Sequence, residues 1–389
     1  MPGNEQNSSG LTAVRAIYGN RAKVAARLKE QGRSIVGYFC AYAPNEILTA
    51  AGMAPFRIIG DMHEPITEAD AYLETIMCPY IRSCFDLGVK GRYRFLDGLL
   101  VPHTCDTVER MYNIWRYYLK PQYAQFVNIP HKVRPSSQRF LKGELERFIK
   151  KAETWIGEPI SEGRLREAID LHNENRALLR ELYDLRKPDP PLISGGEVLQ
   201  TMIAAMSLPV QESSDLVRSV ITEVKARGSG PEQRDARVLV YGPELDDTAF
   251  IDLVEDCGAN VVADDMCIGS RHFTTDVSVT ADPLDGLASR YMEGIPCPRT
   301  YKEQPEVGGH PVDLENRFSY LKDMVREFNV NGVIVSVIRF CDTHEMDVPD
   351  LLEYLEKYDI PALYIEHDYS MNTIGQLKTR VQAFLEMIG

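Results

Sequence analysis

The tripeptide Cys-Asp-Thr occurs twice in the chain, and each copy follows an apolar run that is typical of a buried strand. The first copy, at residues 105–107, follows Leu96–Pro102, and the second, at residues 341–343, follows Gly332–Phe340. A helical pattern comes after each copy, and Asp106 is placed to cap the first of these helices. Buried strands that alternate with helices are typical of parallel sheets, in which ligands bind beyond the carboxyl ends of the strands. The two thiols therefore suggest one shared metal site.

The pattern of strands and helices divides the chain into three regions. A length of 389 residues exceeds what one hydrophobic core usually holds. Strands and helices alternate over residues 1–140, with a helix expected over 13–31, and again over 231–389, so each of these regions is predicted to be an α/β domain. Between them, residues 141–230 have the periodicity of helices and end in a Gly-Ser-Gly-Pro linker. The predicted fold is thus α/β, with two domains joined by a helical segment.

The composition is that of a soluble globular enzyme, with 44% apolar and 26% charged residues. A formal net charge of −14 argues against nucleic acid as a partner, because its binding relies on Lys and Arg that neutralise phosphates. The chain has no apolar run near the ~20 residues that a membrane span requires. Residues 1–10 lack the basic and apolar regions of a secretory signal. We therefore expect a cytoplasmic protein with reduced cysteines and no membrane partner.

The chain has eight cysteines, which in a cytoplasmic protein favour metal ligation or catalysis by some of them over a disulfide framework. The pair Cys78 and Cys84 lies at the start of a predicted helix, and two buried, inert thiols are an equally good interpretation of that pair alone. Thiolates favour zinc or iron–sulfur clusters. Structural zinc usually takes four closely spaced ligands, whereas Cys78, Cys105 and Cys341 are far apart in the sequence. Three ligands with an open fourth position suit a reactive cluster.

Several common catalytic motifs are absent from the sequence. It contains no P-loop, no dinucleotide-binding Gly-x-Gly-x-x-Gly after a strand, no Gly-x-Ser-x-Gly elbow and no His-Glu-x-x-His. We therefore expect that the chain does not hydrolyse ATP itself, and a thiol-based site is the constellation that remains.

One basic loop is a candidate anion site in this acidic chain. Residues 131–139 carry Lys132, Arg134 and Arg139, together with two serines that can cap the helix that follows. Basic side chains at the start of a helix form a ready site for anions. A solvated turn is the alternative interpretation of the loop.

Several stretches, taken together and in this order, resemble the 2-hydroxyacyl-CoA dehydratase and benzoyl-CoA reductase family, in particular subunits like the 2-hydroxyglutaryl-CoA dehydratase D-component. The similar stretches are Gly37–Glu46, Ala51–Met53, Cys78–Cys84, His103–Thr107, Asp264–Asp265, Phe340–Asp342 and the carboxyl-terminal Gln376–Met387. The likeness extends over nearly the whole chain. It implies two flavodoxin-like domains, each with a doubly wound parallel sheet.

The resemblance also implies an iron–sulfur cluster of the 4Fe-4S type between the two domains. Its ligands are then Cys78, Cys105 and Cys341, with Cys84 as the alternative to Cys78. We expect a structural role, and no metal ligation, for Cys257, Cys267 and Cys297.

The loop before Glu46 departs from the family's pattern, because relatives often have a cysteine where this chain has Ala43, and the thiol here lies at Cys40. Tyr42 and Glu46 of this loop are the candidate catalytic residues. The candidate contacts of CoA phosphates are the basic residues Lys132, Arg134 and Arg139.

The partners that the resemblance implies are a paralogous iron–sulfur subunit, an ATP-hydrolysing activator, a low-potential electron donor and a CoA-thioester substrate. In this family, reduction of benzoyl-CoA by one-electron steps and dehydration of an (R)-2-hydroxyacyl-CoA through a ketyl radical share the injection of an electron. Arginine outnumbers lysine 29 to 14, which favours a high-GC genome and hence the benzoyl-CoA reductase of an aromatic degrader. A dehydratase subunit is the alternative. A second alternative is an electron-relay or scaffold subunit that has a cluster but no substrate site.

Overall fold

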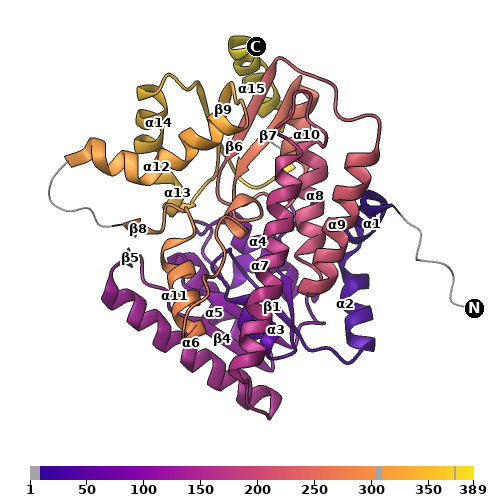
Figure 1. The fold of residues 1–389 in the computed structure, drawn as a ribbon, viewed down its shortest axis with the longest axis vertical. Coiled ribbons are helices and arrows are strands. Elements are labelled where there is room, and N and C mark those ends of the chain that lie inside the picture. The colour runs from indigo at the N-terminus through magenta and orange to yellow at the C-terminus, as the bar shows by residue number, and fades with distance from the viewer. Residues whose placement is uncertain (1–8, 303–308, 372–373) are drawn as a thin grey trace, which may run out of the picture.

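The computed structural model describes residues 9–302, 309–371 and 374–389, and it contains two parallel four-stranded sheets. Figure 1 shows one sheet in the lower half of the molecule and the other in the upper half, with a group of long helices along one side of both. The sheets with their helices confirm the predicted α/β class and its two doubly wound sheets. Among the described residues, no helix is both long and apolar enough to cross a membrane.

The first sheet has the strand order β2-β1-β3-β4, and all its neighbouring strands are parallel. Its strands are β1 (Ile35–Tyr38), β2 (Ala54–Arg57), β3 (Gly98–Pro102) and β4 (Tyr123–Val127). The connecting helices are α3 (Asn45–Ala50), α4 (Pro79–Val89) and α5 (Asp106–Tyr118). Every residue of β1, β2 and β3 is buried, as expected for strands that are covered on both faces.

The second sheet repeats this topology, with the order β10-β9-β6-β7. Its strands are β6 (Ala236–Tyr241), β7 (Ala259–Asp265), β9 (Gly332–Ile338) and β10 (Ala362–His367). The helices of this half are α10 (Ala249–Asp256), α11 (Pro283–Glu293), α12 (Gly309–Glu327), α13 (Asp342–Glu345), α14 (Val348–Lys357) and α15 (Ile374–Ile388). In both sheets the direction of winding reverses between the first and third strands, and such a switch point is where doubly wound sheets bind ligands.

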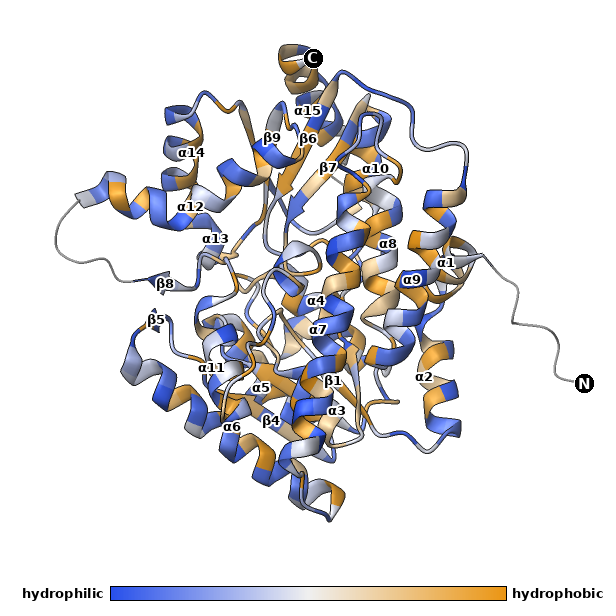
Figure 2. Cartoon of the chain, viewed as in Figure 1, coloured by the Kyte–Doolittle hydropathy of each residue, from blue (hydrophilic) through white to orange (hydrophobic). Residues whose placement is uncertain are grey.

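Four helices connect the two sheets: α6 (Pro135–Ile156), α7 (Glu162–Asp184), α8 (Gly195–Ala205) and α9 (Val210–Ala226). Their apolar stripes face the cores, and Figure 2 shows hydrophilic and hydrophobic residues alternating along α6. The helix expected over 13–31 is instead two helices, α1 (Gly10–Gly19) and α2 (Arg21–Glu30), because the side chain of Asn20 caps α2.

The helices at the amino terminus pack against the connecting region. Helix α1 contacts both α8 and α9, and a Cβ added at Gly10 would lie 2.6 Å from the backbone nitrogen of Val220, so only glycine permits this close approach. The carboxyl-terminal half also contacts the connecting region and the first half. Helix α11 packs on α6, and the short strands β5 (Lys132–Val133) and β8 (Tyr301–Lys302) pair in parallel. Because these contacts cross the predicted domain boundaries at residues 140 and 230, the boundaries stay predictions.

Candidate metal centre

A cavity of about 80 Å³ lies where the carboxyl ends of the two sheets face each other, and six cysteines line it. These cysteines are Cys40, Cys78, Cys105, Cys267, Cys297 and Cys341. The rest of the wall comes from both halves of the molecule, and it combines polar side chains that include Glu244 and His344 with apolar ones: Phe39, Ile81, Val108, Pro243 and Ile338. The site is therefore rich in sulfur, and most of its accessible lining is apolar.

The three cysteines predicted as ligands lie together in this wall, and each is the N-cap residue of a helix. Cys78 precedes α4, Cys105 precedes α5 and Cys341 precedes α13. Cys105, rather than Asp106, is thus the cap of α5. Neither sulfur makes a side-chain cap hydrogen bond, but the nearby backbone amides of the first turn act to lower the pKa of Cys78 and of Cys105. The amide groups and the positive ends of α4 and α5 favour negative charge on these sulfurs.

Burial keeps these three thiols protonated while no metal is bound. It raises the pKa of Cys78 to about 11 and that of Cys105 to about 12, and it raises the pKa of Cys341 well above its usual range. The neighbouring sulfurs also raise the pKa of Cys341, because three negative charges would repel one another. A soft metal would displace these protons on binding, since thiolates are the ligating form. Converging thiols in an apolar cavity fit an iron–sulfur cluster.

Cys84, the alternative to Cys78, is not among the residues that line the cavity. It is fully buried within α4, where burial raises its pKa well above the usual range and the charge of Asp246 acts in the same direction. The geometry therefore favours Cys78 as the candidate ligand from this helix.

Cys40, Cys267 and Cys297 form a second thiol group in the same cavity. A hydrogen bond with Cys267 lowers the pKa of Cys40 to about 6, against the opposing effect of burial. The same hydrogen bond raises the pKa of Cys267 well above its usual range. Cys40 has a φ of +61°, a conformation that L-residues rarely adopt and that occurs most often at functional sites.

Cys267 and Cys297 lie in the cavity wall, although the sequence analysis expected them to have only a structural role. Cys267 follows the end of β7 by two residues, and that position at a strand's carboxyl end was a usable signal. Cys297 lies in the loop after α11, and no local pattern marks it. Cys257, by contrast, is the C-cap residue of α10 and lies outside the cavity wall.

A buried polar network of Asp265, Arg271 and His344 leads to the sulfur of Cys341. Asp265 accepts two hydrogen bonds from Arg271, of 2.8 and 2.9 Å, and both residues are fully buried. Nη1 of Arg271 lies 2.9 Å from Nε2 of His344, and Nδ1 of His344 lies 3.4 Å from Sγ of Cys341. Burial and the charge of Arg271 hold the pKa of His344 well below its usual range.

The candidate catalytic residues Tyr42 and Glu46 are buried, and neither lines the cysteine cavity. Oε1 of Glu46 accepts a hydrogen bond of 2.9 Å from Arg176, and Oε2 accepts one of 2.8 Å from the hydroxyl of Tyr291. The Tyr42 hydroxyl contacts the hydroxyl of Thr300. Burial opposes ionisation of Glu46, but the charge of Arg176, together with neighbouring positive groups such as Arg290, outweighs it and holds the pKa to about 2. A catalytic role for either residue stays a prediction, and the contacts are those of structural groups.

The basic residues Lys132, Arg134 and Arg139 are exposed at the start of α6. The N-cap of α6 is Arg134, with no side-chain cap, so the expectation that serines of this loop cap the helix is wrong. The side chain of Lys132 lies over the ring of Tyr301 on the paired strand β8.

A second cavity, of about 310 Å³, lies beside the paired strands β5 and β8. Its wall includes Tyr301, Lys302, Arg317 and Tyr320. Cys297 lines both cavities, so the second cavity adjoins the wall of the cysteine cavity.

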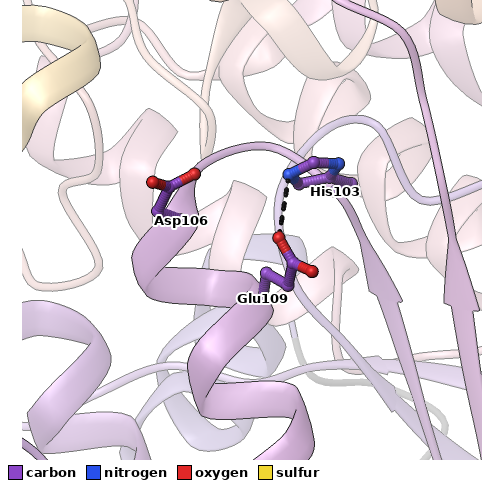
Figure 3. Close-up of side chains that lie close together, drawn as sticks. All are labelled: His103, Asp106 and Glu109. Atoms are coloured by element: carbon purple, nitrogen blue, oxygen red, sulfur yellow. Dashed lines mark ion pairs between the residues drawn. The ribbon is translucent and has the colours of Figure 1, made fainter.

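A further group of metal-binding residue types, His103, Asp106 and Glu109, lies at the start of α5 (Figure 3). Nε2 of His103 pairs with Glu109 at 3.3 Å, and its Nδ1 lies 3.0 Å from Oδ1 of Asn128. The two carboxylates occupy the first turn of the helix, where the positive end of the helix dipole favours them and disfavours a cation. Helix stabilisation thus accounts for this group.

Comparison with known proteins places the chain in a family. The family described as 2-hydroxyglutaryl-CoA dehydratase, D-component, matches residues 40–388. A putative dehydratase subunit, YjiM of Escherichia coli (strain K12), is 30% identical over 373 residues, which are 93% of each chain. A benzoyl-CoA reductase subunit of Thauera aromatica is 28% identical, covering 95% of this chain and 94% of that one. The (R)-phenyllactyl-CoA dehydratase beta subunit of Clostridium sporogenes is 26% identical, covering 94% of each chain. The family match confirms the resemblance, and the chain belongs to the 2-hydroxyglutaryl-CoA dehydratase D-component family.

Proposed function

We propose that the chain is the iron–sulfur subunit of a cytoplasmic, ATP-dependent aryl-CoA reductase that dearomatises benzoyl-CoA by one-electron steps. The observation that carries the proposal is the convergence of Cys78, Cys105 and Cys341, from both halves of the molecule, on one cavity. These three thiols would hold the cluster, which supplies low-potential electron transfer when it is bound. An activator would hydrolyse the ATP, because the chain has no P-loop.

The second thiol group supports reduction over dehydration. Six thiols exceed the four thiolates of an ordinary 4Fe-4S cluster, so the cavity wall offers more sulfur atoms than one such cluster needs. Reduction of an aromatic ring consumes electrons, whereas dehydration through a ketyl radical returns its electron at the end of the cycle. We take the additional sulfur atoms beside the cluster as support for the reaction that consumes electrons.

Glu244 is a carboxyl group of the cavity wall that can deliver a proton to a reduced ring. Its Oε1 pairs with the buried Arg57, while Oε2 has no hydrogen-bond partner among the described residues. Burial raises the pKa of Glu244 to about 8, against the opposing charge of Arg57. The carboxyl group can thus carry a proton near neutral pH and release it from Oε2.

The CoA portion of the substrate would lie along the second cavity and the basic residues near it. Lys302 of β8 lines that cavity, and Lys132 lies on β5, the strand that pairs with β8. Arg134 and Arg139 continue the positive charge along the start of α6, where the positive end of the helix dipole also favours phosphate. The shared wall at Cys297 would bring the acyl group near the metal centre.

Product analysis tests the proposal in an anaerobic assembly of the chain, a paralogous subunit and an activator. Supplied with ATP and a strong reductant, it should convert benzoyl-CoA to a non-aromatic diene and consume reductant in proportion to product. Glu244→Gln should slow this conversion without changing the iron content. Formation of an enoyl-CoA from an (R)-2-hydroxyacyl-CoA, with reductant needed only in catalytic amounts, would establish the dehydratase alternative. Failure with both substrates, in an assembly with full iron content, would leave the electron-relay or scaffold subunit.

A further inference from the structure

The imidazole of His344 lies beside the sulfur of Cys341 in a fixed orientation. The two residues are three apart at the start of α13, and Nδ1 of His344 is 3.4 Å from Sγ of Cys341. His344 is only 4% exposed, so water does not compete for this contact. The direction of the hydrogen bond depends on which ring nitrogen carries the proton.

Arg271 determines that tautomer. A guanidinium group can only donate hydrogen bonds, and Nη1 of Arg271 lies 2.9 Å from Nε2 of His344. Nε2 must therefore accept, and it cannot carry the proton of the neutral ring. The proton is on Nδ1, which faces the sulfur, so His344 donates an N–H···S hydrogen bond to Cys341.

The guanidinium group has little freedom to release the ring. Asp265 holds it with two hydrogen bonds, and Nη1 also donates to the carbonyl oxygen of Gly242 at 2.9 Å. The hydroxyl of Tyr320 donates to Asp265 at 2.7 Å and keeps that carboxylate in place. The orientation of His344 is thus built into the fold from the end of β7.

We propose that His344 is a positioning residue that donates its Nδ1 proton to the sulfur of Cys341 and thereby raises the reduction potential of the metal centre. The inference rests on the proposed function, in which Cys341 is a ligand. A hydrogen bond to a ligand sulfur stabilises the electron-rich reduced cluster more than the oxidised one, and such bonds are among the factors that set the potentials of iron–sulfur clusters.

The tautomer can be tested in the full chain before any iron is added. Nitrogen-15 NMR of histidine-labelled protein should show His344 protonated at Nδ1 and not at Nε2, with the signal assigned by its loss in His344→Leu. Replacing Arg271 with Met should allow the Nε2-protonated form to appear. A wild-type His344 that carries its proton on Nε2 would overturn the inference, whatever the function of the protein.

The potential is tested in the iron-loaded chain by an EPR-monitored redox titration. His344→Leu should retain iron, shift the midpoint potential to a more negative value and lose the coupling between the cluster and an exchangeable proton. His344→Asn, whose side-chain N–H can occupy the place of Nδ1, should restore part of both signals. His367→Leu, a change at another buried histidine, is the matched control and should leave the potential unchanged.

The outcomes separate the inference from the proposed function. An unchanged potential and coupling in His344→Leu, with full iron content, would contradict the role of His344 alone. A wild-type chain that takes up no iron would contradict the proposed function, and the NMR result would still decide the direction of the hydrogen bond.

Discussion

Arg271 and Asp265 form a fully buried ion pair at the end of β7, with N–O distances of 2.8 and 2.9 Å, and this pair holds the imidazole that faces Cys341. Replacing Asp265 with Asn would leave the charge of Arg271 buried and uncompensated. Loss of one partner of a buried pair costs about 3 to 5 kcal/mol, so the free energy of unfolding should fall by about that amount in chemical denaturation.

The matched control for this change is Glu174→Gln, which breaks an exposed ion pair with Arg218. Exposed pairs contribute about 0 to 1 kcal/mol, so this variant should unfold close to the wild type. Equal stability of the Asp265 and Glu174 variants would show that Arg271 has enough other contacts to tolerate the loss.

Glu46→Gln should destabilise the protein in a pH-dependent way. The carboxyl group has its pKa held to about 2, against 4.5 for an ordinary glutamate, so it contributes stability above pH 4.5 that is lost as the pH falls toward 2. The shift corresponds to about 3 kcal/mol. The difference in unfolding free energy between wild type and variant should therefore be largest at pH 7 and should shrink below pH 4.5. A difference that stays constant down to the lowest pH at which the protein folds would contradict this assignment.

The basic residues at the start of α6 should matter for substrate affinity and not for the metal centre. The double change Arg134→Ala and Arg139→Ala should raise the apparent KM for the CoA thioester and reduce its salt dependence, with iron content unchanged. Because exposed charge contacts contribute only ~0.2 to 1 kcal/mol each, Lys132→Ala alone should have a small effect. Alanine at two exposed arginines on other helices, Arg218 and Arg326, is the control. An unchanged KM at low ionic strength would show that the loop is only solvated surface.

The purified chain should be inactive without its partners. Since it lacks a P-loop, it should not hydrolyse ATP, and turnover should require a paralogous subunit and an activator. An ATPase assay on the chain alone, with the activator as the positive control, checks this. ATP hydrolysis that copurifies with the chain through successive columns would contradict the division of labour.

Much of the fold followed from local patterns in the sequence. The runs that became β3 and β9 are almost entirely apolar because both faces of these strands are buried, and the Cys-Asp-Thr copies lie where those strands end. Such signals depend only on neighbouring residues. The helix break at Asn20 was missed because a single capping side chain decides it.

The full set of cavity cysteines could not be predicted in the same way. The loops that carry Cys40 and Cys297 are joined by long-range contacts, in which the Tyr42 hydroxyl meets the carbonyl oxygen of Ile295 and the hydroxyl of Thr300. The contacts of Glu46 could not be predicted from its neighbours in the sequence either. Its position in a motif suggested catalysis, but the residue that neutralises it, Arg176, is on a helix distant in the sequence.

The iron and acid-labile sulfide content of the anaerobically purified chain tests the central claim most directly. The account predicts that the wild type binds both, that Cys78→Ser, Cys105→Ser and Cys341→Ser each lose most of the iron, and that Cys84→Ser and Cys257→Ser retain it. Equal iron in all five variants, or zinc in place of iron in the wild type, would contradict the assignment of a metal centre between the two sheets.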